Sequence, residues 1–247
     1  MPIVLLSVAS FISWFVSMIA GGGSPLLLVP TVNVLLGSQA VAPVLTVGLL
    51  AGNLQRCWLL RQYIDWRVTA WQVPGVMVGA LLGAIAFTQI RAEGLQLVIA
   101  LILLWMVLHS WLSQHVRLPG WEIKAWQFLP LGFFNSVGSG LAGTTGPILN
   151  PAYLSYGLDK EAMVATKSIN LVLGHCVKLL TYGSLGVLSP EVLGYGVVIG
   201  VVALPANWLG NRFLQTMSAQ QFKHSVLVLI GVSGLITLWQ ERALLSF

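Results

Sequence analysis

Long apolar stretches, separated by short polar or glycine-rich ones, run through the whole chain. They lack the strict alternation of apolar and polar residues that marks the strands of a membrane barrel, so they predict helices. Most approach the ~20 residues needed to span a hydrocarbon core. We predict segments at about 3–20, 25–37, 40–60, 68–90, 95–113, 126–142, 147–157, 161–182, 190–211 and 223–240. The predicted fold is an all-α polytopic membrane protein.

Two of these segments are too short to span a bilayer. Those that begin at Pro25 and Pro147 have about a dozen residues each, which rise only ~18 Å as a helix. Each follows a glycine-rich break, at 21–24 (Gly-Gly-Gly-Ser) and 143–146 (Gly-Thr-Thr-Gly). We therefore expect half-helices or re-entrant segments at both places.

The two breaks belong to an internal repeat. Setting residue n beside n+122 brings 52–56 (Gly-Asn-Leu-Gln-Arg) against 174–178 (Gly-His-Cys-Val-Lys). Both halves share the order long helix, break, short helix and three long helices, which predicts a duplicated unit. Residues 1–118 form the first membrane repeat and residues 119–247 the second, within one membrane domain. If each unit crosses the bilayer an odd number of times, the second is inverted, as in many secondary transporters.

Composition and charge agree with a chain that is almost entirely membrane domain. Of its 247 residues, 57% are hydrophobic and 8% charged, and the mean hydropathy is +0.87, which is too apolar for a soluble fold. Basic residues gather in linkers at 56–67, 115–124 and 212–223, which the positive-inside rule places in the cytoplasm. The net charge of +5 fits that rule and gives no reason to invoke nucleic acid.

Each glycine-rich break is a candidate anion site. A helix that begins inside the membrane points its N–H groups and positive dipole end at the break, and glycines let a ligand approach the backbone. The alternative is that these glycines serve only close helix packing. The candidate substrate-binding residues at the breaks are Gly22, Gly23, Ser24, Thr144, Thr145 and Gly146.

Two lysines inside the eighth segment point to the same chemistry. Lys167 and Lys178 are eleven residues apart, so they fall on nearly one face of a helix, with Asn170 close to the same stripe. Charged residues inside membrane helices usually face the bundle interior or a cavity, so this stripe predicts an anion path. The alternative for Lys178 is that it snorkels to the interface.

The repeat relates these residues to others in the first half. Arg56 is the partner of Lys178, and Asn53 is the partner of His175, which suggests two cationic gates near opposite membrane faces. All four are candidate site residues. An equal alternative for Arg56 is that it only determines the membrane topology of the chain. His175 is a candidate proton relay, or it only hydrogen-bonds a neighbouring helix.

Several motifs of this chain resemble those of a known family. They are Gly21-Gly22-Gly23-Ser24 with Pro30, Gly132-Phe133 leading through Gly138, Gly140 and Gly143 to Pro151, and Ile64-Asp65-Trp66. With these motifs the chain resembles the sulfite exporter family (TauE/SafE-like, toluene sulfonate uptake permeases) over nearly its whole length. The resemblance implies a bacterial-type inner-membrane permease for sulfite, sulfonates or other small organic anions. The chain departs from the family in its second break, where members usually carry a glycine pair.

Together these features predict a secondary transporter that carries a small anion, sulfite or an organosulfur or organic anion, by alternating access. No cofactor and no metal site is expected. The coupling ion is left open between a proton and Na⁺, and a homodimer in the lipid bilayer is left open as well. A passive anion channel is the nearest alternative, because the same cations would serve it. A more distant one is an intramembrane serine protease that pairs Ser136 or Ser139 with His175, although nothing in the spacing requires these residues to meet.

Overall fold

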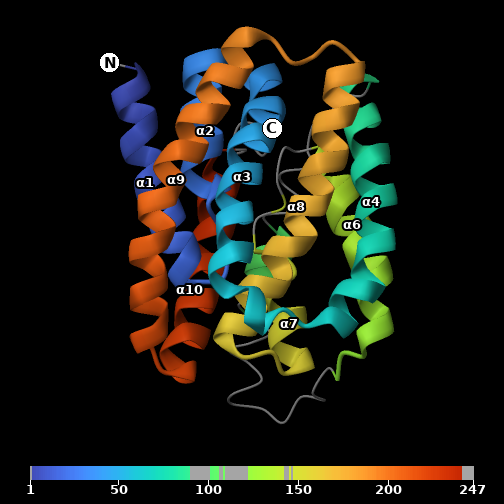
Figure 1. The fold of residues 1–247 in the computed structure, drawn as a ribbon, viewed down its shortest axis with the longest axis vertical. Helices are drawn as coiled ribbons and strands as arrows, with labels where there is room; N and C mark the ends of the chain where they lie inside the picture. The colour runs from blue at the N-terminus through green and yellow to red at the C-terminus, as the bar shows by residue number, and fades with distance from the viewer. Residues whose placement is uncertain are drawn as a thin grey trace.

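Helices make up nearly all of the structure. The computed structural model describes residues 2–89, 101–105, 108, 122–141, 145 and 147–240, and no strand occurs among them. The helices, labelled as in Figure 1, are α1 Pro2–Ile19, α2 Pro25–Leu36, α3 Ser38–Leu60, α4 Trp66–Gln89, α6 Phe128–Leu141, α7 Asn150–Tyr156, α8 Lys160–Ser184, α9 Pro190–Thr216 and α10 Ala219–Gln240. Two short 3-10 turns, η1 Arg61–Tyr63 and η2 Ala125–Gln127, precede α4 and α6. The predicted all-α fold is confirmed.

Two predicted segments differ from the helices found. The segment at 95–113 lies mostly outside the described residues, among which 101–105 are helical. The segment at 147–157 begins as a turn, so α7 starts only at Asn150 and has 7 residues. Pro151 stands in its first turn, where the missing N–H costs nothing, and Gly157 ends it in the left-handed conformation at φ 95°.

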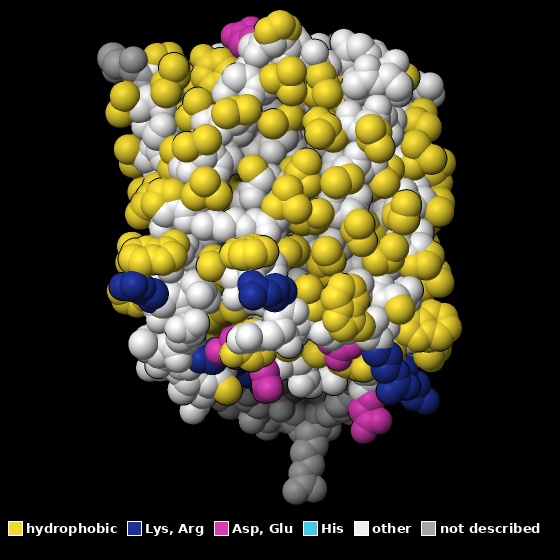
Figure 2. Space-filling model, viewed as in Figure 1, with side chains coloured by type: hydrophobic (Ala, Val, Ile, Leu, Met, Phe, Trp, Pro, Cys, Tyr) yellow, Lys and Arg dark blue, Asp and Glu magenta, His cyan; other side chains and the backbone are white. Residues whose placement is uncertain are grey.

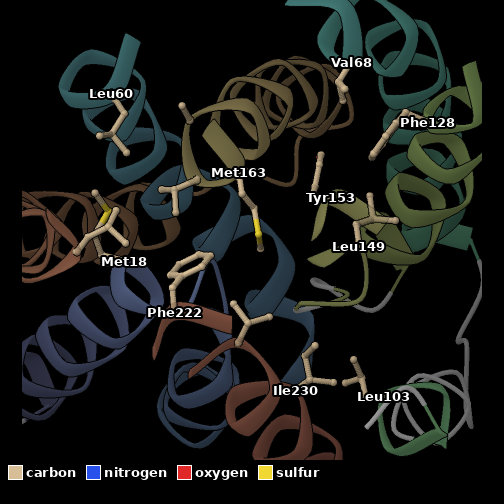
Figure 3. Packing of buried hydrophobic residues seen from close by; sticks show 14 residues of the cluster. Met18, Leu60, Val68, Leu103, Phe128, Leu149, Tyr153, Met163, Phe222 and Ile230 are labelled. Atoms are coloured by element: carbon tan, nitrogen blue, oxygen red, sulfur yellow. The ribbon is translucent and has the colours of Figure 1, made fainter. Parts of the chain in front are cut away.

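Each short helix folds back beside the long helix before it. Leu6 of α1 shares a hydrophobic cluster with Leu28 and Val32 of α2, so α2 returns toward the end of the molecule where the chain begins, the upper end in Figure 1. At the lower end, Phe128 of α6 stacks on Tyr153 of α7 with ring centroids 5.1 Å apart (Figure 3). The two breaks therefore sit at the turns of two helical hairpins that enter from opposite ends.

A second hydrophobic cluster fills the lower end of the bundle. Met18, Leu60, Met163 and Phe222 bring α1, α3, α8 and α10 together there, and each is at most 1% exposed (Figure 3). Burying each such side chain contributes about 1.5–3 kcal/mol where the alternative is water. This cluster closes the bundle below the two hairpin turns.

The closest helix packing joins segments that are far apart in sequence. α4 packs against α6, α1 and α3 pack against α9, and α8 packs against α3 and α4. Glycines allow the α4–α6 approach: a Cβ at Gly79 would collide with the carbonyl oxygen of Phe133, and one at Gly83 would lie 2.7 Å from that of Val137. Small residues at such contacts let membrane helices meet backbone to backbone.

The outer surface is that of a protein embedded in lipid. Five helices are long and apolar enough to cross a membrane: α1, α4, α8, α9 and α10. In Figure 2, hydrophobic side chains cover the flank of the molecule, whereas Lys and Arg gather in its lower part. The chain is therefore an integral membrane protein. The positive-inside rule predicts that the lower end faces the cytoplasm.

Candidate functional site

A buried cavity of about 60 Å³ lies between the two hairpin turns and the long helices α3, α4 and α8. It is several times larger than the ~10–15 Å³ that one water molecule needs. Ten of the twelve predicted site residues line it: Gly22, Gly23, Ser24, Asn53, Arg56, Thr145, Lys167, Asn170, His175 and Lys178. The other two, Thr144 and Gly146, lie outside the described residues. Residues predicted from separate parts of the chain therefore meet in one place.

Lys167 ties the two hairpins together. Its ammonium group donates to the carbonyl oxygen of Gly21 at 3.0 Å and to Oδ1 of Asn150, the first residue of α7, at 2.6 Å. Asn150 Nδ2 reaches back toward the carbonyl oxygen of Ala20 at 3.5 Å. An ammonium has three N–H donors, so two of them fix Lys167 in place and the third is left for the cavity.

The first break has a backbone that glycine favours. Gly21, Gly22 and Gly23 have φ values of 67°, 146° and 94°, in the range that other residues rarely adopt. A Cβ on Gly22 would fall on the Lys167 ammonium, so the missing side chain makes room for that cation. Ser24 makes no capping hydrogen bond with its side chain, and Pro25 opens α2. The N-terminus of α2 therefore lies at the cavity wall without a side-chain cap.

Arg56 is held on one side by hydrogen bonds and is only 3% exposed. Its Nε donates to Asn207 Oδ1 at 2.8 Å and its Nη2 to the Trp14 carbonyl oxygen at 3.1 Å, while the guanidinium lies 4.6 Å from the Trp14 ring centroid. A guanidinium has five N–H donors, so several are left to face the cavity that it lines. This position differs from that of an arginine that only sets topology, which would lie at the surface.

Lys178 lies at the other end of the cavity and does not snorkel. It is 4% exposed, and its Nζ donates to Ser139 Oγ at 3.2 Å. Eleven residues separate it from Lys167 on α8, a rise of roughly 16 Å between their Cα atoms, and the two ammonium groups are held by different partners. The cavity therefore has two cationic ends, with Arg56 and Lys167 at one and Lys178 at the other.

These buried cations have no acidic neighbour among the described residues that line the cavity. The salt bridge that the described part of the chain does contain, between Lys160 and Glu161, lies apart from it. Desolvating a charge costs several kcal/mol unless a partner compensates it. An anion inside the cavity would compensate these three basic side chains.

Four buried polar atoms at the cavity have no hydrogen-bond partner within the described structure. They are Ser17 Oγ, Asn53 Oδ1, Asn170 Oδ1 and His175 Nδ1. Buried polar atoms are nearly always paired in folded proteins, so orphan atoms at a cavity indicate groups that a ligand or water completes.

The cavity also includes residues that the sequence did not mark as site residues. Ser17, Gln72 and Tyr153 line it, and the Tyr153 hydroxyl donates to Gln72 Oε1 at 2.8 Å. A polar residue in an apolar segment was the only signal that could have identified Ser17 and Gln72, and many such residues merely join helices. In the second break, the hydroxyl proton of Thr145 already has an acceptor, because it is donated to Asn135 Oδ1 at 2.7 Å.

The residues of the protease alternative do meet at the cavity, but without a catalytic hydrogen bond. Ser136, Ser139 and His175 all line it. Ser139 Oγ accepts from Lys178, and His175 Nδ1 has no partner within the described structure. A serine that uses His175 as its base needs that imidazole within hydrogen-bond reach, and no hydrogen bond joins His175 to Ser136 or Ser139.

Comparison with protein families matches residues 5–237 to the family described as Sulfite exporter TauE/SafE. The match covers almost the whole chain. The chain belongs to the sulfite exporter TauE/SafE family. Membership confirms the resemblance seen in the sequence and makes the chain a member of a family of membrane transporters. Neither a curated protein nor a solved structure matches the chain.

Proposed function

We propose that this TauE/SafE protein is a secondary transporter of a small anion, sulfite or an organosulfur or other organic anion, in a bacterial-type inner membrane. One observation carries the proposal: Arg56, Lys167 and Lys178 are buried around one cavity that no described acidic residue lines. An anion in that cavity supplies the missing counter-charge. Family membership supports a transporter of this kind.

The binding position that fits best lies beside Lys167. There the ammonium of Lys167 and the guanidinium of Arg56 both line the cavity, and the N-terminus of α2 at Pro25 lines it as well. Ammonium, guanidinium and helix N-terminus each favour negative charge. Lys178 at the other end of the cavity, with Ser139 beside it, then serves entry or exit.

The packing pattern supports an inverted repeat. The repeat pairs α1 with α6, α3 with α8 and α4 with α9. Under this pairing the contact between α1 and α9 has its counterpart in the contact between α6 and α4. The contact between α3 and α9 likewise has its counterpart in the contact between α8 and α4. All of these contacts occur, and α3–α8 maps onto itself. The two hairpins also enter from opposite ends (Figure 1). Both features are expected for two units, 1–118 and 119–247, related by an axis in the membrane plane.

This packing also bears on how access would alternate. Because the tightest contacts join helices of different repeats, a movement of one whole repeat against the other would break them all. We instead assign the moving boundary to the region between two mixed groups, α1 with α9 and α4 with α6. Helices α3 and α8 lie between these groups and carry Arg56, Lys167 and Lys178. Rocking there would open the cavity to one side at a time.

The test is anion binding by the purified protein and a matched pair of variants. A panel of sulfite, thiosulfate, sulfate, sulfoacetate and short carboxylates, with chloride as control, should raise the apparent melting temperature selectively, because a ligand of the folded state stabilises it by mass action. Lys167→Met should weaken binding of the best anion by roughly 10- to 150-fold, since a hydrogen bond to a charged group contributes about 1.5–3 kcal/mol.

Lys223→Met is the control, because Lys223 is exposed on α10 and does not line the cavity. It should bind the anion as the wild type does. Wild-type affinity in Lys167→Met would remove Lys167 from the site. A panel without any shift, in detergent and again in lipid, would contradict anion binding in this cavity.

A further inference from the structure

Each of two unpartnered oxygen atoms in the cavity lies one helical turn from a cation. Asn53 precedes Arg56 by three residues on α3, and Asn170 follows Lys167 by three residues on α8. Residues three apart share a helix face, and α3 and α8 pack against each other. All four side chains line the cavity. Each helix thus presents a cation and an amide together.

The orientation of both amides follows from their hydrogen bonds. Asn53 Nδ2 donates to the Leu49 carbonyl oxygen at 2.8 Å, and Asn170 Nδ2 donates to that of Thr166 at 2.7 Å. A carbonyl oxygen only accepts, so the amide nitrogen must face it and the oxygen must point away. Both Oδ1 atoms are therefore acceptors that lack a donor within the described structure, in residues only 2% exposed.

An anion without hydrogen atoms would satisfy the cations and leave both oxygens unpaired. We propose that the substrate is an anion that also carries a neutral hydrogen-bond donor, a hydroxyl group, with its charge on Arg56 and Lys167 and its hydroxyl directed at Asn53 or Asn170. The proposal rests on the proposed function and narrows its substrate class to hydroxylated anions, including a singly protonated oxyanion.

Two other donors fit less well. The ammonium group of a zwitterion would donate to these oxygens, but it would lie close to Arg56 and Lys167, and like charges repel strongly in a site of low dielectric constant. A bare Na⁺ would satisfy the oxygens as a cation and meets the same repulsion. A hydroxyl brings the donor without the charge.

The experiment compares anions that differ only by a hydroxyl in place of a methyl group. The pairs are glycolate with propionate and isethionate with propanesulfonate, and glycine is the zwitterionic probe. Binding is measured on the intact purified protein by titrating its thermal stability in a choline buffer without Na⁺. Leaving a buried acceptor unsatisfied weakens binding, so the hydroxylated member of a pair should bind about 5- to 150-fold tighter, and glycine should bind more weakly than glycolate.

Variants separate this subsite from the rest of the cavity. Asn53→Leu and Asn170→Leu keep the approximate size of the side chain and remove the acceptor, so either change should reduce the preference for the hydroxylated anion while binding of the methyl analogue persists. Ser233→Ala is the matched control, since Ser233 Oγ is also buried and unpartnered but does not line the cavity. It should leave the preference unchanged.

Equal binding of both members of a pair by the wild type would overturn the inference, since water would then be donating the missing hydrogen bonds to the two oxygen atoms. A preference for the hydroxylated anion that appears only when Na⁺ is added would also overturn the inference. Both results would leave anion transport standing. If neither member of any pair binds, nor sulfite nor sulfate, then the proposed function fails together with this refinement of it.

Discussion

Lys167 shows at the residue scale how an asymmetric site arises within a repeated chain. Subtracting the repeat offset, 167 − 122 = 45, gives Leu45 as its partner, and Leu45 is fully buried in an apolar cluster. In the proposed repeat, only the second unit therefore supplies this cation, whereas Arg56 and Lys178 are at equivalent positions of the two units. The Lys167 ammonium bonds to Gly21 of one hairpin and Asn150 of the other. A ligand that changes the hydrogen bonds of Lys167 would therefore affect both hairpins.

Gly22 allows a residue-scale test of that arrangement. Gly22→Ala would place a methyl group on the Lys167 ammonium, and we expect it to abolish stabilisation by the best anion of the panel. Gly157→Ala is the matched change, because Gly157 also has a positive φ but faces open space. It should lower the free energy of unfolding by about 1–2 kcal/mol from backbone strain and keep anion binding. Anion stabilisation in Gly22→Ala equal to that of the wild type would contradict this role.

The sequence predicted the candidate site residues better than it predicted their partners. Periodicity within one helix brought Lys167, Asn170 and Lys178 to one face, and the repeat added Arg56. Asn207 and Trp14, which hold Arg56, are 151 and 42 residues away from it. No local pattern links such positions, because their contacts depend on how the helices pack.

At the scale of elements, the glycine-rich breaks were the most reliable signal. Three consecutive glycines cannot continue a helix without large entropic cost, and the proline after them restarts one, so α2 begins at Pro25 as predicted. The second break contains threonines, and there the chain makes a turn at 147–149 before α7 begins. Local propensity identified the break but not the length of the helix after it, and that helix packs its Tyr153 on Phe128.

The orientation of α9 gives an element-scale prediction. Its N-terminal end lies at the upper end of the molecule and the turn to α10 at the lower end, where the basic residues gather (Figures 1 and 2). In a Cys57→Ala, Cys176→Ala background, Glu191→Cys should react with a membrane-impermeant maleimide in intact cells. Gln220→Cys should react only after permeabilisation. The reverse pattern would contradict the assigned orientation.

At the scale of the whole molecule, the bundle combines tight packing with a polar centre. Glycines bring α4 and α6 into backbone contact, and α1 and α9 meet in the corresponding place on the other side. Between these groups lies a small cavity lined by buried basic side chains. A permanently open pore would require a continuous water-filled path, whereas a small cavity between tightly packed helices fits a carrier that exposes its site to one side at a time.

The most direct test of the central claim, that this cavity carries a small anion as a transporter, is counterflow. Proteoliposomes loaded with the unlabelled anion that stabilises the protein best should transiently accumulate the labelled anion from a dilute external solution, with saturable kinetics. Lys167→Met should lose this accumulation and Lys223→Met should keep it. Uptake that never exceeds equilibrium and rises in proportion to concentration, or equal counterflow in Lys167→Met, would contradict the account.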